Sequence, residues 1–165
     1  MLQLNRVTTQ YVENEDRLRL TGEGPAGEAC VVWITRRLLG RLLPALFGWL
    51  EGRVMAAPRA EILQSFAQEA ARASIKRQAP VRAPGDSISF LVISIEVTRG
   101  EKSLVLKFRG AGDKAASFTL EAQPLRQWLA IVQSQCGKAE WRMQEWPVWM
   151  TESEAMKLAP GAKPH

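Results

Sequence analysis

Few residues in this sequence have the types and spacing that catalysis or metal binding requires. The one histidine, His165, is the last residue of the chain. The body of the chain therefore lacks an imidazole to act as a general base or a metal ligand. Cys30 and Cys136 lie in apolar stretches with no partner base that would activate a nucleophile. We therefore predict no catalytic residue, no metal site and no cofactor.

The remaining polar motifs do not form a reaction centre either. The glycine-containing stretch 109–114 (RGAGDK) joins two predicted strands instead of leading into a helix, which favours turn formation over phosphate binding. Carboxylates such as Glu96, Asp113 and Glu121 are scattered along the chain. No catalytic pair can be deduced from them. The sequence indicates a protein that is not an enzyme.

The composition favours one globular domain inside the cell. Cys30 and Cys136 have no redox or metal-ligand spacing, so we interpret them as buried free thiols in a reducing cytosol in preference to a disulfide. The N-terminus has no secretory pattern, and no window of about 18 apolar residues is long enough for a membrane span. We expect a cytoplasmic protein with no membrane partner.

Hydrophobic periodicity predicts three strands, a helical pair, three more strands and a last helix. The first three stretches, 4–12, 14–24 and 28–35, alternate apolar and polar residues or are rich in β-branched residues. The later strand stretches are 87–98, 103–108 and 116–122, and the last helix begins at Pro124 and ends near Gly137. In 87–98 the period slips near Phe90, which suggests either a β-bulge or a strand covered on both faces.

The helical pair follows Thr35, a good N-cap. The first helix has an apolar face that covers about half its circumference, with Pro44 on the opposite side. We expect this face to pack into the core. The second helix has a narrower apolar stripe, which we also expect to face inward and which comprises Ile62, Leu63, Phe66, Ala70 and Ala73.

This order of elements predicts an α+β fold, a small antiparallel β-sandwich or barrel-like sheet. A helix-turn-helix insertion, 35–78, would lie between two three-stranded halves, and a C-terminal helix would follow the last strand. We predict a single globular domain over 1–150 and a partly disordered tail over 151–165.

The tryptophans after the last helix allow two interpretations. Trp141, Trp146 and Trp149 lie in a segment without a clear period. They would either pack back onto the domain, for example as an extra strand, or form an apolar rim for a partner. We favour packing back, because proteins seldom leave three tryptophans exposed.

Positive charge is concentrated on the helical pair and its exit loop. Residues 36–82 carry nine Lys and Arg against three Glu, a net charge of +6, whereas the remainder of the chain is −1. Such a pair could contact nucleic-acid phosphates, and the basic residues that we nominate are Arg37, Arg41, Arg72, Lys76 and Arg77. Gln64 and Gln68 would add polar groups for base edges. The alternative, which we favour, is a solvated outer face.

The order of elements also resembles the globular head domain shared by end-joining repair scaffolds and centriolar assembly proteins. In that superfamily a small antiparallel sandwich carries a helix-turn-helix insertion, and a helix after the last strand continues into a dimeric coiled coil. The insertion would here be 35–77, the last strand SFTLEA and the final helix PLRQWLAIVQSQC. No heptads follow Gly137, so the resemblance implies a relative without the coiled-coil stalk.

The sequence thus predicts a non-catalytic interaction or scaffold module that forms a homodimer. The nominated interaction residues are Leu39, Leu43, Phe47 and Leu50 of the first helix, with Trp141, Trp146 and Trp149. The alternative function is a basic accessory protein that binds nucleic acid through 36–82.

Overall fold

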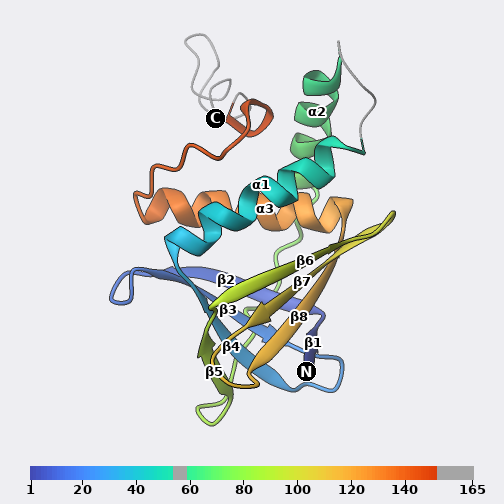
Figure 1. Cartoon of the computed structure of the whole chain (residues 1–165). Helices are drawn as coiled ribbons and strands as arrows, with labels where there is room; N and C mark the ends of the chain where they lie inside the picture. Colours follow the sequence, from blue (N-terminus) through green and yellow to red (C-terminus); the bar gives the residue numbers. More distant parts are fainter. Residues whose placement is uncertain (54–58, 152–165) are drawn as a thin grey trace.

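The computed structural model describes residues 1–53 and 59–151. Within these ranges the chain forms eight strands and three long helices (Figure 1). Their bounds are β1 Leu2–Leu4, β2 Arg6–Val12, β3 Arg17–Glu23, β4 Ala29–Ile34, α1 Arg36–Glu51, α2 Ala60–Ala73, β5 Ile88–Leu91, β6 Ser94–Arg99, β7 Ser103–Arg109, β8 Ala115–Glu121 and α3 Ala122–Lys138. Residues 152–165 of the predicted tail lie outside the described residues.

The strands form two four-stranded mixed sheets, in the orders β2-β3-β4-β5 and β1-β8-β7-β6. The predicted α+β class, the helical insertion and the C-terminal helix are confirmed. The two predicted antiparallel three-stranded halves are present as β2-β3-β4 and β6-β7-β8, but the short fourth strand of each sheet was not predicted. Each antiparallel trio gains a short fourth strand that pairs in parallel, because β5 joins β4 and β1 joins β8.

Each short strand continues the chain directly into a strand of the other sheet. At the second crossing, the backbone N–H of Val92 donates to Trp33 O of β4 at 2.9 Å. The next N–H, of Ile93, donates to Arg109 O of β7 at 2.7 Å. The period slip near Phe90 therefore marks a transfer between sheets, and neither the bulge nor the doubly covered strand explains it.

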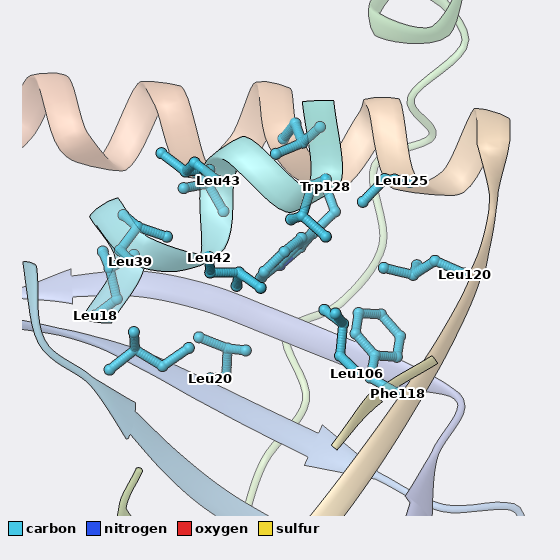
Figure 2. Close-up of a cluster of buried hydrophobic side chains, with 14 of the residues drawn as sticks. Leu18, Leu20, Leu39, Leu42, Leu43, Leu106, Phe118, Leu120, Leu125 and Trp128 are labelled. Carbon is cyan, nitrogen blue, oxygen red and sulfur yellow. The ribbon is translucent and has the colours of Figure 1, made fainter. Parts of the chain in front are cut away.

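One hydrophobic core joins the two sheets to α1 and α3. Figure 2 shows leucines of α1 meeting Leu18 and Leu20 of β3, strands of the other sheet, and α3. Thr35 caps α1, since its hydroxyl accepts a hydrogen bond from the backbone N–H of Leu38. Pro44 lies on the exposed side. The predicted inward packing of the wide α1 face is confirmed.

The orientation of α2 is opposite to the predicted one. The side chains of Ile62, Leu63 and Phe66 are 55%, 44% and 69% exposed. The residues that α2 buries are Gln64, Gln68 and Ala71. In Figure 1, α2 stands on the far side of α1 and α3 from the sheets, where only helices offer it a surface.

The tryptophan-containing segment after α3 packs back onto the domain, as predicted, but not as a strand. Residues 141–147 lack regular structure and a helical turn follows at 148–151. Trp146 and Trp149 pack on Phe47 of α1, with ring centroids 5.7 and 5.8 Å apart. Trp141 contacts Tyr11 edge to face at 5.5 Å. These contacts close the core on the α1 side.

Asp16 in the β2–β3 turn holds the start of this segment. Its Oδ1 accepts hydrogen bonds from Tyr11 Oη at 2.7 Å and from Trp141 Nε1 at 3.1 Å. These two hydrogen bonds, assisted by the charge of Arg36, lower the pKa of the Asp16 carboxyl. The hydrogen bond to Asp16 raises the pKa of Tyr11 to about 12. The carboxylate form is thus the one that fits this structure.

Both cysteines are free and buried. Burial raises the pKa of the Cys30 thiol to about 11 and that of Cys136 to about 12. The interpretation of the two cysteines as buried, unbridged thiols is confirmed.

Two leucines that were both predicted to face inward should respond differently to truncation. Leu46 is fully buried and Leu63 is 44% exposed. Leu46→Ala, like Leu42→Ala, should lower the free energy of unfolding by roughly 2–5 kcal/mol, because it opens a cavity in the core. Leu63→Ala should stay within about 0.5 kcal/mol of the parent. Chemical denaturation measures all three; equal losses at Leu46 and Leu63 would contradict the exposed orientation of α2.

Asp16→Asn should make stability less dependent on acid pH. Asparagine tolerates the positive φ of 51° at this position but cannot supply a carboxylate. Because the carboxyl pKa is lowered on folding, its contribution is present above the unfolded pKa and is lost as pH falls through the folded value. The stability gap between parent and variant, from thermal melts, should be widest above about pH 5 and should close in acid. Parallel curves down to pH 2.5 would show that the charge contributes nothing.

Candidate functional site

The interface between α2 and α3 is polar and almost completely buried. Gln64 Nε2 donates to Leu50 O of α1 at 2.9 Å, and Gln64 Oε1 accepts a hydrogen bond from Arg126 Nη2 at 2.5 Å. Gln68 Nε2 donates to Arg126 O, also at 2.9 Å. We call Gln64, Gln68 and Arg126 the polar clamp. It ties α2 to the end of α1 and to the first turns of α3.

Two more polar contacts extend the interface along α2. Gln127 Nε2 donates to Ala71 O at 3.1 Å, and Arg72 Nη2 donates to Gln133 Oε1 at 3.0 Å. Gln64 and Gln68 are 2% and 1% exposed, so they cannot contact base edges, contrary to the role suggested for them from the sequence. Their side-chain amides instead form the hydrogen bonds that hold α2 against α1 and α3.

The polar clamp is costly to bury. Burial, and after it the nearby charge of Arg53, lowers the pKa of Arg126 to about 10. Arg126 Nη1 and Gln68 Oε1 have no hydrogen-bond partner among the described residues. The guanidinium lies over the ring of Trp149, 5.4 Å from its centroid, which recovers part of this cost. Hydrogen bonds with fixed directions, and not apolar burial, therefore set the rotation of α2.

This rotation leaves an apolar stripe on the outside of α2, formed by Ile62, Leu63, Phe66, Ala70 and Ala73. We call these five residues the α2 stripe. They recur at intervals of three and four, as on one face of a helix. Amphipathic helices normally turn such a face inward. Packing among the residues that the structure describes does not explain an outward stripe beside a buried polar face.

The interaction residues nominated from the sequence lie elsewhere, in or against the core. Leu39, Leu43 and Leu50 are fully buried, and Phe47, Trp141 and Trp149 are 4%, 7% and 2% exposed. Trp146 is half-buried. A partner could reach them only if the core opened. The α2 stripe, unlike these nominated residues, is accessible to a partner without any opening of the core, as is Val148 of the tryptophan segment, which is 49% exposed.

An arginine-lined hollow lies at the opposite end of α1 from α2. The hollow, of about 740 Å³, lies between the first turns of α1 and the segment after α3, and its lining comprises Arg36, Arg37, Gly40, Arg41, Arg142, Met143, Gln144 and Glu145. Arg36 Nη2 donates to Arg142 O at 2.8 Å, which ties the two walls together. Four arginines and, among the described residues, one acidic residue, Glu145, line the hollow.

The structure brings together only part of the predicted phosphate-contact set. Arg37 and Arg41 line the arginine hollow, with Arg36 and Arg142, which the sequence analysis did not nominate. Arg72 belongs to the α2–α3 interface, and Lys76 and Arg77 follow the end of α2. The signal for Arg36 was present in the charge of the helical pair, but only the fold brings Arg142 to it.

Comparison with models of protein families, with curated proteins and with solved structures found no match. The resemblance to the head domains of end-joining scaffolds and centriolar proteins stays a prediction. In the part of the chain that the structure describes, no three His, Cys, Asp or Glu residues are grouped so that they could hold a metal ion. None of the described helices is long and apolar enough to cross a membrane. The candidate sites are accordingly two surfaces, the α2 stripe and the arginine hollow.

Proposed function

We propose that this protein is a non-catalytic interaction module that associates with a second copy of itself through the α2 stripe. The observation that carries the proposal is the exposure of Ile62, Leu63 and Phe66 on a helix that buries glutamines instead. The polar clamp prevents α2 from rotating to hide these side chains without breaking several buried hydrogen bonds. None of the described residues covers them, which supports their burial against another molecule.

The distribution of side-chain sizes along α2 supports a second copy as that molecule. The bulky members of the stripe, Ile62, Leu63 and Phe66, lie in the first half of the helix, and Ala70 and Ala73 lie in the second half. In an antiparallel pair related by a two-fold axis near Phe66, the two Phe66 side chains meet at the axis, and Ile62 of each helix faces Ala70 of its partner. Large side chains then fill the space above alanines, and the helices can approach closely.

The expected affinity is modest. Covering a largely exposed Ile, Leu or Phe side chain contributes roughly 1–2 kcal/mol, and a symmetric pair covers six of them. This gain of on the order of 10 kcal/mol is opposed by an association cost of about 4 kcal/mol or more. A dissociation constant in the micromolar range follows, so the monomer and dimer should exchange at ordinary protein concentrations.

The proposal keeps the predicted homodimer but moves its interface. The sequence analysis expected the surface of the first helix or the segment 141–149 to form the interface. Those apolar residues are enclosed in the monomer, so the association would leave the tryptophan environments unchanged.

Phe66→Asp should abolish self-association, because it places a charge at the centre of the helix pair. Ile88→Asp is the matched control, since Ile88 of β5 is 59% exposed but lies outside the α2 stripe. Sedimentation equilibrium from about 1 to 200 μM should show dimer formation by the parent and by Ile88→Asp, and a monomer for Phe66→Asp. A parent that stays monomeric throughout, or a Phe66→Asp variant that still dimerises, would overturn the proposal.

The antiparallel arrangement can be checked separately by cross-linking. Ile62→Cys and Ala70→Cys chains should form disulfides with each other faster than either forms with itself, because position 62 of one chain faces position 70 of the other. Cys30 and Cys136 are buried and do not interfere. Faster self-linking of Ile62→Cys would contradict the antiparallel pairing.

A further inference from the structure

The arginine hollow carries positive charge that the described residues do not neutralise. Among residues 1–53 and 59–151, none of the arginines of the hollow forms an ion pair, whereas Arg6, Arg17 and Arg109, for example, each do. Arg37, Arg41 and Arg142 are exposed at its rim. Arg36 is held by its hydrogen bond to the Arg142 carbonyl. Three guanidinium groups are therefore available to a ligand.

The helix itself adds to this positive field. No acidic residue lies in the first turn of α1, where one would offset the positive end of the helix dipole. Instead the first two residues of the helix are Arg36 and Arg37. Their repulsion from the helix end is unfavourable in the absence of a bound anion. Two arginines at the positive end of the α1 dipole therefore destabilise the fold, and a bound anion would offset this repulsion.

Glu145 is the one carboxylate in the hollow, and it cannot balance four arginines. It is half-buried, and its Oε2 atom has no hydrogen-bond partner among the described residues. A methyl group built on Gly40 would lie 3.4 Å from Glu145 Oε1, which places the carboxylate against the α1 backbone. The hollow keeps a net charge of +3 from its charged side chains.

We infer that the arginine hollow binds phosphates of a double-stranded nucleic-acid backbone, without regard to sequence. Arg37 and Arg41 are one helical turn apart, so their side chains emerge about 5–6 Å from each other and can contact successive phosphates of one strand. Arg142 approaches from the opposite wall. Arginine forks suit phosphate oxygens, and each of these arginines can make paired hydrogen bonds to one phosphate.

The lining favours a duplex over a single strand. No aromatic residue lines the hollow, so unpaired bases would find no ring on which to stack. Gln144 is the one side-chain amide, which is too little for base-edge readout. Contacts to the backbone alone, in contrast, require only the guanidinium groups that are present.

This assignment replaces the broader basic surface 36–82 with a smaller site. Arg72 is engaged with Gln133, and Lys76 and Arg77 lie beyond the end of α2. The double variants Arg37→Gln/Arg41→Gln and Lys76→Gln/Arg77→Gln therefore remove the same charge from two places. All four side chains are exposed, so neither variant should alter the fold, which circular dichroism can verify.

Fluorescence anisotropy with a labelled 20-base-pair DNA duplex, at 50 to 200 mM NaCl, tests the inference. Three phosphate contacts predict an affinity that falls about 40-fold over this range, because each contact adds about 0.9 to the slope of log K against log salt. Arg37→Gln/Arg41→Gln should leave only a three- to fourfold fall and weak binding at 50 mM salt. Lys76→Gln/Arg77→Gln should retain the parental slope. Phe66→Asp, which should stay monomeric, should still show the salt slope of three phosphate contacts, so that phosphate binding is tested independently of the dimer proposal.

Three results would overturn the inference. Equal weakening by the two double variants would place the phosphates on a diffuse basic surface. Displacement of the duplex by polyglutamate at the same charge concentration would indicate an acidic protein partner. Tighter binding to a single strand of equal length would contradict the role assigned to backbone contacts alone.

Discussion

The rotation of α2 depends on the buried contact between α2 and Arg126 of α3. Arg126 donates a hydrogen bond to Gln64, and Gln68 donates one to the Arg126 carbonyl. Because hydrogen bonds have direction, they hold α2 with its polar side against α3 and α1. An apolar interface would allow the helix to turn until its bulky side chains were covered. The protein instead keeps a guanidinium among helices, with its charge desolvated and partly compensated by the face of Trp149. Removing one member would leave the others buried and unpaired, which is why the arrangement is stable once formed.

The two sheets, α1, α3 and the tryptophan segment form the packed core that positions the groups contacted by α2. The wide apolar face of α1 is fully used within the chain, since both sheets, α3 and the tryptophan segment all contact it. The two short strands are exchanged between the sheets, and each exchange ties one half of the chain to the other by parallel pairing. The halves thereby repeat one arrangement, a short strand, an antiparallel trio and a helix, although the sequence shows no repeat. The α2 helix falls outside this arrangement, and its outer face does not contribute to the core.

Sequence reasoning succeeded where one periodic signal decides the outcome. The strand trios, the cap at Thr35 and the α1 face follow from alternation, a hydroxyl at the right position and a 3.6-residue period. It failed where two signals compete. In α2 the apolar set at 62, 63, 66, 70 and 73 and the buried set at 64, 68 and 71, two glutamines and an alanine, have the same period, and hydrophobicity alone selects the wrong one. Choosing correctly requires Arg126, whose partners on α2 are distant in sequence.

The same limit applies to the arginine hollow, because Arg142 joins Arg37 and Arg41 only through the path of the chain after α3. The crossings between the sheets could not be predicted for a similar reason. The slip in the alternating pattern near Phe90 indicates that the covered face of the strand changes, but it does not indicate which sheet covers it.

The positions of the α2 stripe and the arginine hollow relative to α1 connect the two proposed roles. The arginine hollow lies at its first turns, and α2 is bound to its last turn through Leu50, about 20 Å away along the helix. A dimer formed through α2 would therefore not cover the hollow of either chain. The dimer would carry two arginine hollows at a fixed separation. If this separation matches the path of the phosphate backbone, the second hollow would bind the same duplex intramolecularly. Three phosphate contacts are too few for strong binding at physiological salt, whereas six on one rigid dimer are comparable to those of established non-specific DNA binders. If both proposals hold, association through the α2 stripe and phosphate binding at the arginine hollow would reinforce each other, because each dimer formed on a duplex would increase the number of phosphates that its members hold together.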